Sequence, residues 1–240
     1  MGLSPTGFEL VIFDCDGVLV DSEAIACRVE AELLTAAGFP HAFEDVRRDY
    51  LGRSSDTILR MIEERFGRRL PDDMKARSQA VVLEAFEREL RPIEGVEQAI
   101  AALAGPRCVA SSSDPARIRR SLELTGLLAF FDPHLFSAAM VASGKPAPDL
   151  FLLAAREMGA EPEGCVVIED SVPGVIAGRA AGMRVLGFHG GGHCDPGHAQ
   201  RLVDAGAHAV FDDMRALPAE LVAALSGGGA RSGPSRRAGC

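Results

Sequence analysis

Two aspartates at the end of an apolar run are the first residues of this chain that could carry out chemistry. Asp14 and Asp16 follow the apolar run 10–13 and precede Gly17. Such a run is typical of a buried strand in a parallel sheet, and ligands bind beyond the carboxyl ends of such strands. Two carboxylates on one face of an extended segment could hold a divalent cation, or divide nucleophile and acid/base roles. The alternative interpretation is an ordinary acidic turn.

A second apolar run ends in the same way. Residues 165–168 are apolar, and Glu169 and Asp170 follow them. If both runs are neighbouring strands of one parallel sheet, their acidic ends lie at the same edge. Carboxylate oxygens are the ligands that Mg²⁺ prefers. The two acidic pairs therefore predict a magnesium site at that edge.

Hydroxyl groups and one lysine could bind a phosphoryl group at the same edge. Ser111, Ser112 and Ser113 end an apolar run and come shortly before Pro115, which favours the first turn of a helix. Hydroxyls and the amides of a helix N-terminus suit a phosphate. Lys145 stands between a glycine and two prolines, in a stiff frame for one cation. Each feature has a common alternative, a helix cap for the serines and a solvated charge for the lysine.

The elements that position these residues alternate between strand and helix from residue 92 onward. Apolar runs predict strands at 107–110, 135–137, 165–169, 184–188 and 209–211. Helical patterns lie between and after them at 115–124, 148–158, 172–181 and 196–205. Such alternation indicates right-handed βαβ units, so the predicted fold is α/β with a Rossmann-like open parallel sheet.

Residues 21–91 differ from the rest because they show helical spacing and no strand-like run. We expect an all-helical insert there, between the two parts of the α/β core at 1–20 and 92–225. The tail 226–240 is rich in Gly, Ser and Arg, so we expect it to be disordered.

Composition excludes several classes of protein. With 240 residues, 47% of them hydrophobic, the chain can bury a sizeable core. Its net charge of -9 argues against a nucleic-acid partner, because proteins bind nucleic-acid phosphates with clustered Lys and Arg. No apolar run approaches the ~18 residues of a membrane helix, so we expect no membrane partner. Six cysteines without a Cys-x-x-Cys pair indicate reduced thiols and a cytoplasmic protein.

Taken together, the four polar segments resemble, in order, the motifs of the haloacid dehalogenase superfamily of phosphotransferases. These motifs are the Asp-x-Asp-Gly-Val run from Asp14, the strand-end serine, the Gly-Lys-Pro run, and the Glu-Asp-Ser run from Glu169. The resemblance covers roughly residues 8–225. The helical insert is similar to the cap carried by β-phosphoglucomutase, phosphoglycolate phosphatase and 6-phosphogluconate phosphatase.

The resemblance implies a role for each residue that matches a motif. Asp14 would be the nucleophile that becomes an aspartyl-phosphate, and Asp16 the acid/base that protonates the leaving alcohol and activates water. Ser111 and Lys145 would hold the nonbridging phosphoryl oxygens.

The same resemblance implies Mg²⁺ as cofactor. Its ligands would come from the side chain of Asp14, the backbone carbonyl of Asp16, Asp170, and Glu169 either directly or through water. The cation would also neutralise the carboxylates against an anionic substrate.

The implied activity is that of a magnesium-dependent phosphatase of a small phosphorylated metabolite, a sugar phosphate or sugar-acid phosphate. Substrate contacts are expected from Ser112 and from the insert loop at Gly52, Arg53 and Ser54. Arg53 could pair with an anionic group at the non-reacting end, or be a solvated surface charge. We expect a monomer or weak homodimer.

Two alternatives remain. A phosphohexomutase is disfavoured because a histidine of the first cap helix of β-phosphoglucomutase corresponds, counted without gaps, to Ala26. A non-catalytic phosphometabolite-binding protein is disfavoured because the motif residues are all present. A metal-independent dehalogenase would lack Asp16.

Residues 188–198 are rich in His, Cys and Gly. Their composition is typical of a transition-metal site, but the spacing of His193, Cys194 and His198 matches no common structural zinc pattern, and the family has a variable loop here. We interpret the segment as a flexible glycine loop, whose role the sequence leaves open.

Overall fold

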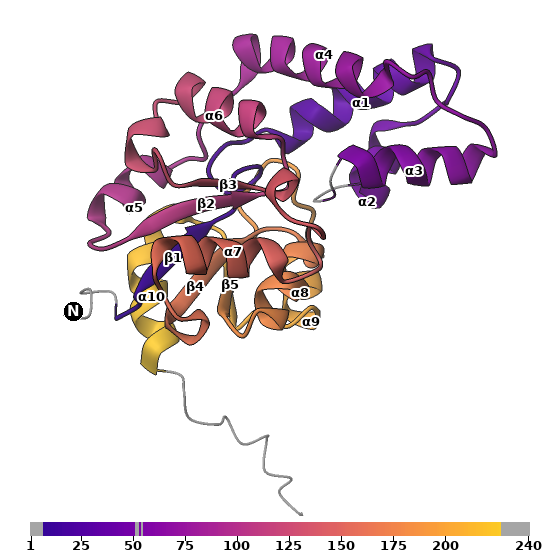
Figure 1. The fold of residues 1–240 in the computed structure, drawn as a ribbon. Coiled ribbons are helices and arrows are strands. Elements are labelled where there is room, and N and C mark those ends of the chain that lie inside the picture. Colours follow the sequence, from indigo (N-terminus) through magenta and orange to yellow (C-terminus); the bar gives the residue numbers. More distant parts are fainter. Residues whose placement is uncertain (1–6, 51–52, 54, 227–240) are drawn as a thin grey trace, which may run out of the picture.

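A six-stranded parallel sheet forms the centre of the computed structural model, which describes residues 7–50, 53 and 55–226 (Figure 1). The strands are β1 (Leu10–Phe13), β2 (Arg107–Ser111), β3 (Leu135–Ser137), β4 (Cys165–Glu169), β5 (Arg184–Phe188) and β6 (Ala209–Phe211). Their spatial order is β3-β2-β1-β4-β5-β6. The predicted α/β class and open parallel sheet are therefore confirmed.

The strand order places the two acidic strand ends side by side. The chain moves from β1 to β2 on one side and later returns to β4 on the other. Ile12 pairs with Cys108 of β2 and with Val167 of β4, so the three strands end at nearly the same level. The crevice at such a reversal of strand order is where open α/β sheets bind ligands.

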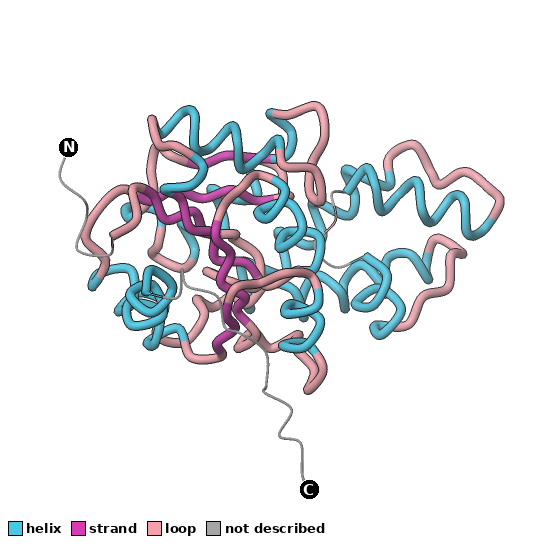
Figure 2. The backbone as a smooth tube through the Cα atoms, turned by 90° about the horizontal axis from the view of Figure 1, so that it is seen from below, coloured by secondary structure: helices cyan, strands magenta, loops and turns pink. Residues whose placement is uncertain are grey.

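The alternation of side chains along β1 supplies both faces of the sheet. Leu10 and Ile12 belong to one apolar cluster, whereas Val11 and Phe13 belong to the other. The first cluster is covered by α7 (Asp149–Met158), α8 (Val172–Ala180) and α9 (His198–Asp204). The second is covered by α5 (Val96–Ala102), α6 (Pro115–Leu124) and α10 (Leu217–Ser226). Figure 2 shows the strands enclosed by helices on both sides.

Between β1 and α5, where the sequence predicts a helical insert at residues 21–91, the described part of the chain forms four helices. The helices are α1 (Glu23–Ala36), α2 (Phe43–Tyr50), α3 (Ser55–Phe66) and α4 (Met74–Glu89). They lie together to one side of the sheet (Figure 1) and share an apolar cluster of their own, which includes Leu34, Val46 and Ile62. The short and highly charged α2 was not predicted as a separate helix, nor were α5 and α10.

Short 3-10 helices occur at Leu128–Phe130, Ala138–Met140, Pro162–Gly164 and Met214–Ala216. Among the described residues, no helix is both long and apolar enough to cross a membrane. The predicted disordered tail lies outside the described residues, apart from Ser226 at the end of α10.

Replacing the central strand residue Ile12 by alanine should lower the free energy of unfolding by about 2–5 kcal/mol, because its fully buried side chain leaves a cavity. Denaturant titration followed by circular dichroism measures this. Ile176→Ala is the matched control, since Ile176 is 42% exposed and should change stability by less than about 0.5 kcal/mol. Equal losses would mean that β1 is not the centre of the core.

Candidate active site

Three buried carboxylates and one buried lysine meet where β1 and β4 end. Oxygens of Asp14, Glu169 and Asp170 lie within 4.8 Å of one another. The Nζ of Lys145 lies 2.9 Å from Oδ1 of Asp14 and 3.1 Å from Oε2 of Glu169. The loop before α7 thus brings a cation to two strands that are distant in the sequence. The structure thus brings together four of the residues that the sequence analysis singled out.

The charges of this cluster do not balance. Burial and the negative charge of Glu169 raise the pKa of Asp14 well above its usual value, although Lys145 opposes them. Burial also raises the pKa of Glu169, again against the effect of Lys145. For Lys145 burial lowers the pKa, but the charges of Asp14 and Glu169 outweigh it and the pKa rises. Three carboxylates facing one ammonium group form a site that a further cation would stabilise.

Asp16 has a different environment from Asp14. Its Oδ1 accepts hydrogen bonds from Ser22 at 2.7 Å and from Arg117 at 2.9 Å, and its Oδ2 accepts one from Ser113 at 2.6 Å. Burial raises the pKa of Asp16, but the charge of Arg117 and the two hydroxyl donors outweigh it and bring the pKa below its usual value. The environments of the two aspartates therefore shift their pKa values in opposite directions.

Arg117 was not predicted to be part of the site. It lies on α6, and its guanidinium group also contacts the ring of Phe86 from the insert, with 5.0 Å between Cζ and the ring centre. The helical spacing that places it one turn after Ser113 was visible in the sequence, but its pairing with Asp16 across 101 positions was not.

The serines at the end of β2 lie beside Asp16. The Oγ of Ser111 is buried 3.4 Å from Oδ2 of Asp16, and it accepts a hydrogen bond of 3.1 Å from the backbone amide of Ser113. Ser112 contributes to the lining of the adjacent cavity. The hydroxyls of Ser111 and Ser113 therefore lie against the carboxylate of Asp16.

The backbone at Gly17 passes close to Asp170. Gly17 has a φ of +80°, and a Cβ built on it would lie 1.9 Å from Oδ2 of Asp170 and 2.9 Å from Cε1 of His193. Glycine is needed here for both reasons, because other residues resist this φ and have no room for a side chain.

His193 contacts the carboxylate of Asp170. Its Nε2 lies 2.9 Å from Oδ2 of Asp170. Burial lowers the pKa of His193, but the hydrogen bonds to Asp170 and Cys194 outweigh this effect and raise the pKa to about 11. Both His193 and His198 are buried, so two side chains of the predicted glycine loop pack inside the protein. The contact with Asp170 was missed because no local pattern links the two residues.

A cavity lies between the carboxylates and the insert. From the core it is lined by Asp14, Asp16, Ser111–Ser113 and Arg117, and from the insert by Glu23, Ala26, Cys27, Glu30, Val46, Tyr50, Arg53, Ser55 and Ile58. Arg53, for which the sequence predicts a substrate contact, lines this cavity, and its Nε donates to the backbone carbonyl of Asp49 at 3.1 Å. Gly52 and Ser54, also predicted substrate contacts, lie outside the described residues.

The chain is similar to known proteins of one family. The family model described as haloacid dehalogenase-like hydrolase matches residues 8–182. The 6-phosphogluconate phosphatase of Escherichia coli K12 is 32% identical over 78% of this chain and 86% of its own, and hexitol phosphatase B of the same strain is 32% identical over 76% and 84%.

Solved structures agree with these sequence matches. A conserved haloacid dehalogenase-like protein of unknown function from Agrobacterium tumefaciens C58 is 44% identical, with a TM-score of 0.78 over 92% of this chain and all of that one. A family hydrolase from Deinococcus radiodurans R1, with bound phosphate and sodium, is 33% identical, with a TM-score of 0.69 over 91% and 95%.

The fold, the acidic groups at the central strand ends and the matches together identify a hydrolase. The chain belongs to the haloacid dehalogenase-like hydrolase family. Within this family the chain is a phosphoric monoester hydrolase, in common with the phosphatases that it resembles over most of its length.

Replacing Gly17 by alanine should lower phosphatase activity by at least about 100-fold, because the new Cβ would displace the carboxylate of Asp170. Steady-state phosphate release from an aryl phosphate measures this. Gly67→Ala is the matched control: Gly67 also has a positive φ, of +62°, but nothing lies within 4 Å of its Cβ position. It should lose about 1–2 kcal/mol of stability and retain activity. Similar activity in both variants would contradict the argument.

Proposed function

We propose that the protein is a magnesium-dependent phosphatase that hydrolyses a small sugar phosphate or sugar-acid phosphate through an aspartyl-phosphate on Asp14. The observation that carries the proposal is the pair of opposed environments at the end of β1. Asp14 lies against Lys145 in the carboxylate cluster, whereas Asp16 is held separately by Ser22, Ser113 and Arg117. Two carboxylates held by different partners can divide nucleophilic and acid/base work. Burial and Glu169 raise the pKa of Asp14, and a cation bound at the cluster would oppose this shift and favour the ionised carboxylate that a nucleophile requires.

Asp14 is the nucleophile in this proposal. Its carboxylate oxygen attacks phosphorus, the bond to the leaving oxygen breaks, and a phosphoryl group is left on the aspartate. Lys145 can hold a nonbridging phosphoryl oxygen as well as Asp14, because its ammonium group has three donors. Ser111 offers a hydroxyl from the neighbouring strand. These donors are fixed before the reaction, so they need not reorganise when charge develops.

Asp16 is the acid/base. It gives a proton to the leaving alcohol, and its ionised form then removes a proton from the water that attacks the phosphoryl group. The bond from phosphorus to the oxygen of Asp14 breaks, which releases phosphate and restores the carboxylate. The contacts with Arg117, Ser22 and Ser113 favour the ionised form, which suits the second step. For the first step the proton on Asp16 must be stabilised, so we infer that substrate entry weakens the contact with Arg117.

The residues of the cluster fit Mg²⁺. Asp14 and Asp170 can each give a carboxylate oxygen, the backbone carbonyl of Asp16 a third ligand, and Glu169 a direct or water-mediated contact. The surplus of buried negative charge and the close approach of Gly17 to Asp170 support a cation here. When bound, Mg²⁺ supplies charge neutralisation for the carboxylates and the phosphoryl group.

Residues 21–91 would act as a cap over this site. Both the core and the insert contribute polar side chains to the lining of the cavity. Such a lining suits a leaving group with several hydroxyls. Relatives named 6-phosphogluconate phosphatase and hexitol phosphatase B support a substrate of this kind. Arg53 would contact an anionic end of the substrate. We further propose that the enzyme is cytoplasmic, as a monomer or weak homodimer.

Ala26 supports a phosphatase over a phosphohexomutase. It lies in the lining of the cavity, where it can neither donate nor accept a proton for Asp16. Water attack on a phosphorylated Asp14 is therefore not opposed from this position, and hydrolysis should be the outcome.

Asp14→Asn should abolish phosphate release from every member of a panel of sugar phosphates, hexitol phosphates and 6-phosphogluconate, because an amide is a poor nucleophile. Asp212→Asn is the matched control, since Asp212 follows β6 as Asp14 follows β1 but lies outside the cluster. A colorimetric phosphate assay and circular dichroism decide the point. Release near the wild-type rate by a folded Asp14→Asn protein would refute the nucleophile.

Removal of divalent cations by exhaustive chelation should stop catalysis, and Mg²⁺ should restore it, because the buried carboxylates otherwise repel an anionic substrate. The measurement is phosphate release against added Mg²⁺. Asp170→Ala should raise the Mg²⁺ concentration needed for half-maximal activity. Full activity without any divalent cation would remove the metal from the mechanism.

Glu23→Gln should change the alkaline side of the pH profile. Burial and the charge of Asp16 raise the pKa of Glu23 to about 8. As the pH rises past that value, Glu23 gains a negative charge in the cavity and repels a phosphate dianion, so kcat/KM should fall. Glutamine cannot ionise, and the decline should disappear. Glu32→Gln, an exposed change on the same helix, is the control. Superimposable profiles for wild type and Glu23→Gln would contradict this effect.

A further inference from the structure

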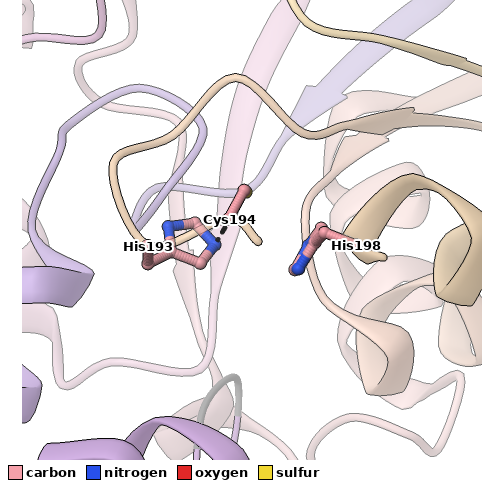
Figure 3. Close-up of side chains that lie close together, drawn as sticks. All are labelled: His193, Cys194 and His198. Carbon is pink, nitrogen blue, oxygen red and sulfur yellow. Dashed lines mark hydrogen bonds between the residues drawn. The ribbon is translucent and has the colours of Figure 1, made fainter. Parts of the chain in front are cut away.

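A second group of side chains that could bind a metal lies beside the carboxylate cluster, in contact with Asp170. His193, Cys194 and His198 each present one ligand atom, and the three atoms lie within 4.8 Å of one another. Figure 3 shows the three side chains, two from the loop after β5 and one from the start of α9. The imidazoles are buried and the thiol is partly buried.

The contacts inside this group resemble the edges of a metal coordination shell. The Sγ of Cys194 lies 3.4 Å from Nε2 of His193, and the same Nε2 lies 2.9 Å from Oδ2 of Asp170. In a tetrahedral site with usual Zn–S and Zn–N bonds, sulfur and nitrogen ligands are about 3.5 Å apart. One proton on Nε2 cannot bond fully to both the sulfur and the carboxylate. A metal ion in its place could bind all three atoms.

We propose that His193, Cys194 and His198 form a binding site for a thiophilic divalent cation of the Zn²⁺ class, and that a cation bound there recruits the carboxylate of Asp170 as its fourth ligand. The binding site stands on its own geometry. Its effect on catalysis rests on the proposed function, in which Asp170 is a ligand of Mg²⁺.

The donor set separates the two sites chemically. Thiolate and imidazole ligands select zinc and similar ions, whereas the oxygen-only cluster that Asp170 forms with Asp14 and Glu169 suits Mg²⁺. Burial raises the pKa of Cys194, but the hydrogen bonds of His193 and His198 outweigh it and lower the pKa, which favours the thiolate that binds metals.

A cation could reach the site through a cavity, and its binding would replace an existing contact of His198. A cavity of about 380 Å³, lined in part by His193, His198, Asp195 and Arg201, opens beside the group. The Nε2 of His198 donates to the backbone carbonyl of Asp170 at 2.5 Å, and Arg201 lies 3.1 Å from its Nδ1. A metal that takes one of these nitrogens replaces one contact, while the other contact can still orient the ring.

Because Asp170 is shared, binding at the two sites should be coupled. A cation held by His193 and Cys194 draws Asp170 away from Asp14 and Glu169, so saturation of the thiophilic site should oppose binding of Mg²⁺ at the carboxylates. The same coupling requires Mg²⁺ to oppose binding at the thiophilic site.

The test uses Co²⁺ as a spectroscopic probe of the full-length protein, freed of metals and kept reduced without added thiols. We expect one equivalent of Co²⁺ to give the near-ultraviolet thiolate-to-cobalt absorption and the visible bands of a tetrahedral centre. Cys194→Ser should abolish the thiolate band, and His198→Asn should weaken Co²⁺ binding by at least about 100-fold, since loss even of outer partners costs roughly 10–100-fold. His189→Asn, in the same loop but outside the group, should match wild type.

A thiolate band that is missing in wild type, or that persists in Cys194→Ser, would overturn the site. This readout needs no catalysis, so it decides the matter even if the proposed phosphatase mechanism fails. Circular dichroism of each variant confirms that a lost band is not lost folding.

The coupling is tested by Zn²⁺ inhibition of phosphate release at several Mg²⁺ concentrations. We expect inhibition by Zn²⁺ that higher Mg²⁺ relieves, and a half-inhibiting concentration at least tenfold higher in Cys194→Ser than in wild type or His189→Asn. Equal inhibition of wild type and Cys194→Ser would overturn the coupling through Asp170.

Discussion

The buried contact of Lys145 with Asp14 and Glu169 is the interaction on which the rest of the site depends. Carboxylates from two neighbouring strands reach one point, and burial makes their mutual repulsion costly. A single ammonium group offsets only part of this charge. The remainder explains why the arrangement suits a divalent cation together with an anionic substrate.

The separation of Asp16 from that cluster gives the site two kinds of carboxylate. Arg117 reaches Asp16 from α6 and also packs against Phe86 of the insert. Asp16, the acid/base group of the proposed mechanism, is therefore linked to the element that we propose as the cap. A movement of the insert that shifts Arg117 would change the proton affinity of Asp16, which connects substrate enclosure with proton transfer.

Much of the fold followed from local pattern. All six strands lie within a residue of the runs that predict them, because buried parallel strands are continuously apolar and short. The helix α2 was missed because eight residues with strong charge and only Val46 and Tyr50 buried carry too little apolar periodicity. The helices α5 and α10 lie outside the segments for which helical spacing predicted a helix. Their apolar residues pack against the sheet, and this packing stabilises them.

The sequence by itself determined the α/β fold, the helical insert and the residues Asp14, Asp16, Lys145 and Asp170, since strand ends and motif spacing are local properties. Only the tertiary structure decided which groups surround them. The pairing of Arg117 with Asp16 and of His193 with Asp170 joins residues far apart in the chain, and no periodicity records such contacts. The pKa of each carboxylate depends on these neighbours and on burial, so the chemistry of the site emerges only when the chain folds.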